Sequence, residues 1–164
     1  MKLLQGFSPV ARPDARKLIL GSMPGTASLD ATQYYAFPRN AFWKIMGNLF
    51  GASPELEYPA RLDVLMDNHI ALWDVIAACH RPGSLDSAIS EDGMATNNFN
   101  RFFALHPQIS HVYFNGQKAA GLFTKKVLPG LEREFSYTTL PSTSPAHAAK
   151  GYAAKLEAWS VLRF

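Results

Sequence analysis

Four short apolar runs, separated by segments with helical spacing, constrain the fold of this 164-residue chain more than any other feature. The runs are Lys17–Gly21, Ile70–Ile76, His111–Phe114 and Phe135–Leu140. Helices are predicted at about residues 41–50, 58–68, 97–106, 117–127 and 148–162. Strands that alternate with helices favour a parallel sheet covered on both faces. We therefore predict an α/β fold, a three-layer α/β/α sandwich with a central four-stranded parallel sheet.

Size and composition bound the class of protein. With 48% hydrophobic and 18% charged residues, the chain is globular rather than disordered. Its length fits one domain, which we place over residues 1–164. No apolar run reaches the length of a membrane span, and the first residues lack the apolar core of a signal peptide. We therefore expect a cytoplasmic protein, and a monomer.

The cysteine and histidine content argues against a metal site or a disulfide framework. The chain has one cysteine, Cys79, which excludes an internal disulfide and any four-cysteine metal site. Cys79 lies in an apolar run, so a small buried side chain is its simplest interpretation. The five histidines show none of the close spacings of a zinc site. The net charge of +3 permits nucleic-acid binding without demanding it.

The segment Gly21–Trp43 follows the first predicted strand and runs to the next helix without an obvious helical pattern. A loop this long in a compact domain is usually functional, and ligands of open parallel sheets bind at the carboxyl ends of strands. We therefore predict that a ligand binds here. The loop begins with Gly21, Ser22, Met23, Pro24 and Gly25. These residues either direct backbone N–H groups at an anion or form a tight turn out of the strand.

Three segments, GSMPG, QYYAFPRNAFWKIMG and LPSTSPAHA, resemble the uracil-DNA glycosylase superfamily, and within it the hypoxanthine-DNA (deoxyinosine) glycosylase branch. The resemblance extends to the strand–loop pattern of nearly the whole chain. It implies a four-stranded parallel sheet between helices and base excision from double-stranded DNA, without a metal or organic cofactor. Such an enzyme flips a damaged nucleotide into a pocket and hydrolyses its N-glycosidic bond.

Asn40 is the catalytic residue that the resemblance implies. Many relatives hold the attacking water with an Asn or Asp in the first motif, where this chain has Ser22. In the hypoxanthine branch the role moves to the asparagine of the PRN-x-FW segment, which is Asn40. An amide offers both an acceptor and donors to a water molecule. From spacing alone an N-cap of the helix that follows is the favoured interpretation of Asn40, whereas the resemblance favours catalysis, and one residue can do both.

Two further residues are candidates for binding the base. The resemblance implies that Tyr35 stacks on the flipped base, although Tyr34 and Tyr35 are otherwise plausible core aromatics. It also places a reader of the base edge on the second strand, where Asp74 is found. A carboxylate can accept the ring N1–H of hypoxanthine, and the alternative is that Asp74 caps or braces a loop.

A loop before the last helix is the predicted DNA contact. Its residues are Ser142, Thr143, Ser144, Pro145, Ala146 and His147, and they resemble the motif that enters the duplex. Hydroxyl groups suit phosphate contacts, and a Ser-Pro turn that caps the last helix is the alternative. Asn115-Gly116 is interpreted as a strand-ending turn rather than as a second reader of the base. Arg81 is a weaker candidate for the DNA backbone, and no lysine is placed for Schiff-base chemistry.

The leading hypothesis is therefore a monofunctional DNA glycosylase acting on deoxyinosine. The same pocket could prefer uracil or xanthine. A second hypothesis is a non-catalytic nucleic-acid-binding module, because Ser22 replaces a familiar catalytic amide. A third, a small-molecule enzyme on an unrelated α/β sheet, is weakened because no dinucleotide-binding, phosphate-loop or serine-hydrolase motif is present.

Overall fold

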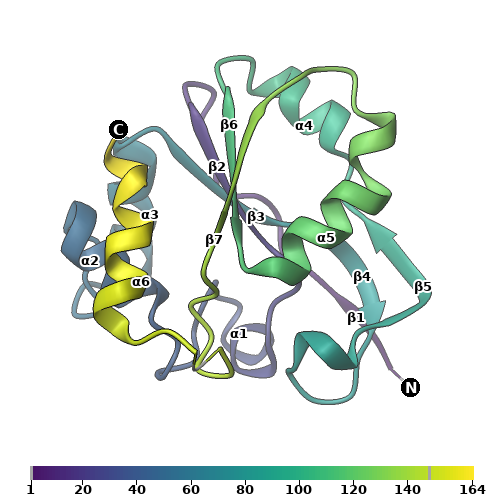
Figure 1. Ribbon diagram of the computed structural model, residues 1–164, viewed down its shortest axis with the longest axis horizontal. Helices are drawn as coiled ribbons and strands as arrows, with labels where there is room; N and C mark the ends of the chain where they lie inside the picture. Colours follow the sequence, from purple (N-terminus) through teal and green to yellow (C-terminus); the bar gives the residue numbers. More distant parts are fainter. Residues whose placement is uncertain (1, 148) are drawn as a thin grey trace.

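A computed structural model describes residues 2–147 and 149–164, and its centre is a parallel sheet (Figure 1). The four strands lie in the order β3, β2, β6, β7. Their bounds are β2 (Lys17–Gly21), β3 (Ile70–Asp74), β6 (His111–Asn115) and β7 (Ser136–Leu140). All three pairings are parallel. The predicted central sheet is confirmed.

Helices cover both faces of this sheet, as predicted (Figure 1). One layer contains α2 (Phe42–Phe50), α3 (Tyr58–Asp67) and α6 (Tyr152–Trp159). The other contains α4 (Phe99–Leu105) and α5 (Gln117–Lys126). In the described part of the chain, no helix is both long and apolar enough to cross a membrane.

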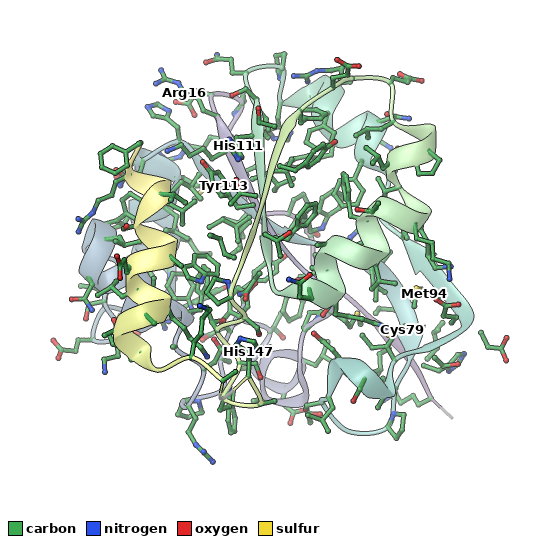
Figure 2. The ribbon with its side chains drawn as sticks, in the orientation of Figure 1. Arg16, Cys79, Met94, His111, Tyr113 and His147 are labelled. Atoms are coloured by element: carbon green, nitrogen blue, oxygen red, sulfur yellow. The ribbon has the colours of Figure 1, made fainter. Side chains whose placement is uncertain are left out.

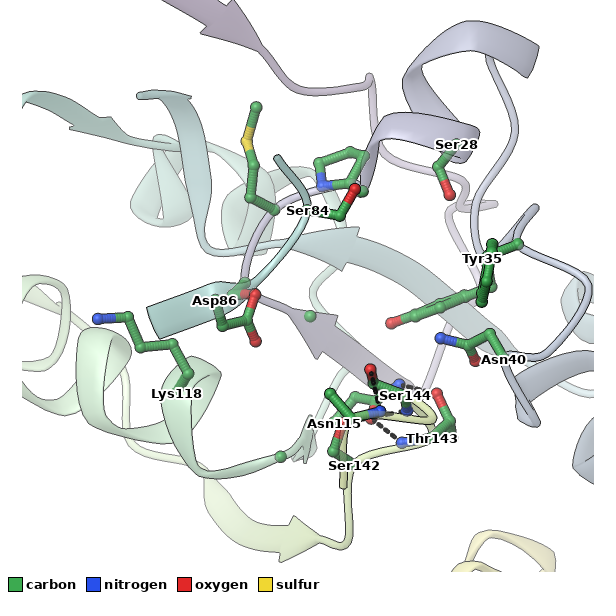
Figure 3. Close-up of a pocket in the computed structure, with 18 of the residues that line it drawn as sticks. Ser28, Tyr35, Asn40, Ser84, Asp86, Asn115, Lys118, Ser142, Thr143 and Ser144 are labelled. Atoms are coloured by element: carbon green, nitrogen blue, oxygen red, sulfur yellow. Dashed lines mark hydrogen bonds between the residues drawn. The ribbon is translucent and has the colours of Figure 1, made fainter. Parts of the chain in front are cut away.

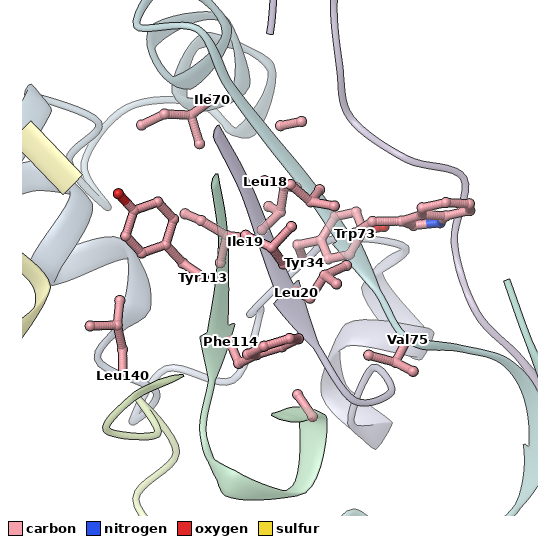
Figure 4. Close-up of a cluster of buried hydrophobic side chains, with 14 of the residues drawn as sticks. Leu18, Ile19, Leu20, Tyr34, Ile70, Trp73, Val75, Tyr113, Phe114 and Leu140 are labelled. Carbon is pink, nitrogen blue, oxygen red and sulfur yellow. The ribbon is translucent and has the colours of Figure 1, made fainter. Parts of the chain in front are cut away.

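The core lies where the helices meet the sheet (Figure 4). Leu18, Ile19 and Leu20 of β2 are fully buried in succession. A strand covered on both faces buries the side chains of both faces, so its apolar run is continuous rather than alternating. This covering explains why β2 was predictable from sequence. Cys79 is also buried, as expected for a small apolar side chain.

A second, antiparallel sheet was not predicted. It contains β1 (Leu3–Gln5), β4 (Ile76–His80) and β5 (Ser90–Thr96), in the order β1, β4, β5. The expectation of one strand over residues 70–76 was wrong, because β3 ends at Asp74 and β4 begins at Ile76. The backbone N–H groups of Val75 and Ile76 donate to the carbonyls of Gly21 and Ser22, at 2.8 and 3.0 Å. These bonds hold the junction between β3 and β4 against the start of the loop that follows β2.

Two helix predictions also need correction. The loop that was expected to lack a helix contains α1 (Thr26–Ala31), whose six residues are too few to show apolar periodicity. The last helix was expected from residue 148, which lies outside the described residues. It begins at Tyr152 because Gly151 is extended (ψ 171°), and it continues as a 3-10 turn over Ser160–Arg163.

Candidate active site

A cavity of about 470 Å³ lies at the carboxyl ends of the parallel strands, which is large enough for a flipped nucleobase. Six stretches of chain supply its walls, namely residues 21–28, 34–40, 74, 84–87, 115–118 and 142–147. The structure therefore brings together all the site residues predicted from sequence. Figure 3 shows how their side chains surround the cavity.

Gly21 stands at the closed end of the cavity, where there is no room for a side chain. A Cβ atom on this residue would lie 2.5 Å from Asp74 Oδ1 and 2.9 Å from the Tyr35 hydroxyl. Glycine is therefore required so that β2, Asp74 and Tyr35 can approach one another. After Gly21, the buried residues Ser22, Met23 and Pro24 form the wall that leads to Gly25 and α1.

Ser22, which stands where many relatives have an Asn or Asp, has a hydrogen-bond partner of its own. Its buried hydroxyl donates to Asp86 Oδ1 at 2.6 Å. Asp86 belongs to the segment between β4 and β5, 64 residues away in the sequence. No periodic pattern marks this contact in the sequence, so Asp86 was missed. The contact fixes the position of the Ser22 hydroxyl in the wall.

Two more contacts hold the segment 81–86 against residues 24–26, which follow β2. Arg81 is buried and donates through Nη2 to the carbonyl of Pro24 at 2.7 Å and through Nε to that of Gly83 at 2.8 Å. Ser84 Oγ donates to Thr26 Oγ1 at 2.7 Å. Arg81 is thus a buried structural brace, and a contact from it to the DNA backbone stays the weaker prediction that it was.

Asn40 lies at the entrance of α2 with its amide directed into the cavity (Figure 3). Its Oδ1 accepts from the backbone N–H of Phe42 at 3.0 Å, which fixes the orientation of the amide. The helix is capped at Ala41, one residue later than predicted, yet Asn40 still satisfies an N–H group of the first turn. Its Nδ2 has no protein partner among the described residues. The side chain is anchored on one edge and available to a ligand on the other.

Tyr35 is held in an unusual backbone conformation, with φ at 55°. Such a left-handed non-glycine residue is strained by about 1–3 kcal/mol and is commonly found at functional sites. One face of its ring stacks on Phe42, with centroids 4.0 Å apart. Its hydroxyl is buried near the Asn115 amide, but that amide is bonded to Thr143 and the hydroxyl forms no hydrogen bond of normal geometry in the described chain. Burial first, and the Asp74 carboxyl second, raise the pKa of Tyr35, against a lowering effect of Asn115. That Tyr35 stacks on a base stays a prediction.

Asp74 ends β3 opposite Gly21 and is only 4% exposed. Its Oδ2 is buried and has no hydrogen-bond partner among residues 2–147 and 149–164. Burial first, and the nearby Asp86 carboxylate second, raise the pKa of Asp74 to about 7, against the lowering effect of Arg81. An unpaired buried carboxyl group is costly, and such groups are concentrated at functional sites. Within the described residues, no hydrogen bond of the Asp74 side chain braces a loop; Asn97 Nδ2 donates to the backbone carbonyl of Asp74 instead, at 2.7 Å.

The predicted DNA loop is fastened to the end of β6. Asn115 exchanges two hydrogen bonds of 3.0 Å with Thr143, one to its hydroxyl and one from its backbone N–H. Asn115 does end a strand at a turn, with Gly116 at φ 95°, but it also lines the cavity. Asn115 could have been predicted to line the cavity, because it lies at the carboxyl end of a parallel strand.

Short local hydrogen bonds shape the rest of this loop. The backbone N–H groups of Ser144 and Ala146 donate to the hydroxyls of Ser142 and Ser144, each at 3.2 Å. The carbonyl of Thr143 accepts from the backbone N–H of Ala41 at 3.0 Å, which joins this loop to the Asn40 turn. His147 is half-buried and lies at the same end of the sheet (Figure 2).

Comparison with known proteins identifies the family. The sequence profile of the Uracil DNA glycosylase superfamily matches residues 8–163. The chain belongs to this superfamily. The resemblance carried by the three sequence segments is thereby confirmed. Separately, the described residues contain no group of three or more His, Cys, Asp or Glu side chains that could hold a metal ion.

Two relatives of this superfamily member are named Hypoxanthine DNA glycosylase. One, from Methanosarcina barkeri, is 39% identical over 70% of this chain and 72% of its own length. The other, from Methanosarcina acetivorans, is 36% identical over 80% of this chain and 90% of its own length. A solution NMR structure from Methanosarcina acetivorans, of a protein presented as a candidate uracil DNA glycosylase, is 32% identical. It covers 99% of this chain and 98% of its own, with a TM-score of 0.80.

Proposed function

We propose that this chain is a monofunctional DNA glycosylase that excises hypoxanthine from deoxyinosine in double-stranded DNA and leaves an abasic site. The observation that carries the proposal is the closed end of the cavity. Two buried polar groups there, Asp74 Oδ2 and the Tyr35 hydroxyl, lack partners in the described protein. Buried polar groups are normally hydrogen-bonded, so a ligand with a polar edge suits this end. The names of the two Methanosarcina relatives support hypoxanthine as the base.

The donors and acceptors of hypoxanthine fit this pair of groups. The ring N1–H of hypoxanthine is a donor, and an ionised Asp74 accepts it. Adenine has an acceptor at N1, which an ionised carboxylate repels. The Tyr35 hydroxyl can donate to an acceptor atom of the base. Asp74 would therefore separate the deaminated base from its normal parent.

Asn40 would position the water for hydrolysis. Its Oδ1 retains a lone pair beyond the bond from Phe42, and its Nδ2 faces the cavity. The water oxygen forms a bond to C1′ while the C1′–N9 bond breaks, and the base departs with the electron pair. The proton lost by the water balances the one that the base gains. A fixed amide lowers the barrier through orientation and through its dipole.

A panel of damaged duplexes tests this proposal. Purified protein is incubated with duplexes that carry deoxyinosine, deoxyuridine or deoxyxanthosine, and abasic sites are then cleaved with alkali. We expect the fastest cleavage at deoxyinosine. If no lesion is cleaved and the protein binds DNA only in a salt-sensitive manner, the enzyme assignment is wrong and a binding module remains.

Uracil is the second candidate base, for a specific reason. Its ring N3–H is a donor flanked by carbonyl groups, so Asp74 can accept from it as from hypoxanthine. The structural relative presented as a candidate uracil DNA glycosylase also supports uracil as a candidate base. A higher rate at deoxyuridine than at deoxyinosine in the same panel would select uracil.

A further inference from the structure

Phe37 places a large apolar ring at the rim of the cavity. It is 44% exposed, although it lines the same cavity as Asn40 and Tyr35. Of the described residues around this cavity, only Phe37 and Leu85 are both large, apolar and exposed by more than a third. A single exposed apolar ring is common on protein surfaces, so it is the position of Phe37 at the mouth of the site that matters, because the ring is there within reach of bound DNA.

The ring is carried on a rigid turn. The carbonyl of Phe37 accepts from the backbone N–H of Asn40 at 2.9 Å, and Pro38 fixes the backbone between them. Asn40 is in turn anchored on the first residue of α2. The place of the ring relative to the amide of Asn40 is therefore set by the fold.

The same turn lies against the predicted DNA loop. The hydrogen bond from Ala41 to the Thr143 carbonyl makes the two segments neighbours, and Figure 3 shows Asn40 beside Thr143 and Ser144. The loop itself offers no large apolar side chain, since residues 142–147 are Ser, Thr, Ser, Pro, Ala and His. Thr143, moreover, is buried. A duplex resting on this loop would meet Phe37 next to it.

A flipped nucleotide leaves a gap in the base stack, and DNA-binding proteins fill such gaps with apolar wedges. We propose that Phe37 is that wedge, which enters the stack and occupies the space of the extruded base. This inference rests on the proposed function. Leu85 is the less suitable candidate, because the adjacent Ser84 is bonded to Thr26 and lies across the cavity from Thr143 (Figure 3).

The test compares duplex with single-stranded substrate, because only a duplex has a stack to fill. We expect Phe37→Ala to lose roughly 10- to 100-fold in excision from duplex deoxyinosine and much less from a single strand. Phe37→Leu keeps an apolar wedge and should retain most of the duplex activity. Leu105→Ala, a change of an even more exposed apolar residue at the C-terminal end of α4, is the control. Equal melting temperatures would verify that all three variants fold.

A second readout does not require bond cleavage. With 2-aminopurine next to the lesion, binding of wild type should raise fluorescence as the stack opens, and Phe37→Ala should reduce that rise. Equal losses on duplex and single strand would overturn the wedge and place the ring on the flipped base. Loss in Leu85→Ala or His147→Ala but not in Phe37→Ala would also overturn it. Failure of wild type to excise any lesion rejects the proposed function instead, while the fluorescence still tests the wedge.

Discussion

The cavity has two polar regions that differ in how their hydrogen bonds are satisfied. In the wall, Asn115 and Thr143 bond to each other twice. At the closed end, Asp74 Oδ2 and the Tyr35 hydroxyl are buried without partners in the described chain. The satisfied pair holds a loop in place, whereas the unsatisfied pair is left for a ligand. The contrast distinguishes residues that hold the site in shape from residues that are free to bind a ligand.

Asn40 combines both properties, and its replacement should have the largest effect. Asn40→Ala removes the amide that would hold water while it leaves the fold intact. We expect kcat to fall by about 10²- to 10³-fold, the cost of losing one oriented dipole at a transition state. Single-turnover excision from duplex deoxyinosine measures it. Asn68→Ala, at the exposed end of α3, is the control and should excise normally.

Asp74→Asn should stabilise the folded protein at neutral pH, because it removes the cost of ionising a buried carboxyl group. The pKa of Asp74 is about 7 in the folded protein, far above the ordinary carboxyl value, so raising the pH from 4 to 7 favours the unfolded state. We expect the asparagine variant to be more stable than wild type by about 2–4 kcal/mol at pH 8, and to differ little at pH 4. Denaturant unfolding at the two pH values measures this difference. Asp92→Asn, a change at an exposed position of β5, is the surface control for the substitution itself.

The same carboxyl group predicts the pH dependence of excision. If ionised Asp74 accepts the ring N–H, excision by wild type should weaken as the pH falls below about 7. In Asp74→Asn that inflection should disappear, and discrimination against adenine should decline. An unchanged profile in the variant would remove Asp74 from base recognition and leave only its effect on stability.

Gly21→Ala tests whether the closed end is as crowded as its distances indicate. The new Cβ would meet Asp74 Oδ1 and the Tyr35 hydroxyl, so we expect a loss of about 1–3 kcal/mol in stability, together with reduced excision. Gly121→Ala is a matched control within α5, with no heavy atom within 4 Å of the added Cβ. It should be neutral or stabilising by up to about 1 kcal/mol.

Thr143→Val should have the smallest effect, because it alters the wall rather than the binding groups. The substitution removes the hydroxyl that accepts from Asn115 Nδ2 and costs about 1 kcal/mol. A loosened loop should raise KM for duplex DNA and leave kcat nearly unchanged. Thr124→Val on the exposed face of α5 provides the control. A fall in kcat with an unchanged KM would place Thr143 among the reacting groups.

The three strands β2, β3 and β6 of the central sheet were predictable because burial on both faces requires a continuous apolar run, as in Leu18–Leu20. The second sheet was not, because β1 has three residues and β5 (SEDGMAT) is largely polar. α1 was not predicted either, because its six residues make too few turns to show a periodic pattern.

The candidate site was predictable where the residues sit in continuous motifs, as Tyr35 and Asn40 do. Asp86 was not, because its bond to Ser22 joins segments 64 residues apart. The structural role of Arg81 was not predictable for the same reason: its partner, the Pro24 carbonyl, is a backbone atom that no sequence pattern marks. Such contacts exist only after the two sheets have packed together.

The most direct test of the contrast between wall and closed end is the pKa of Asp74 with and without a bound base. It can be followed by carbon NMR of the labelled carboxyl group, with a duplex that carries a non-hydrolysable 2′-fluoro analogue of deoxyinosine. If the base donates its N1–H to Asp74, binding should lower the pKa below about 7. An undamaged duplex should leave it unchanged. The same pKa in the free and the lesion-bound protein would contradict the assignment of Asp74 to the base.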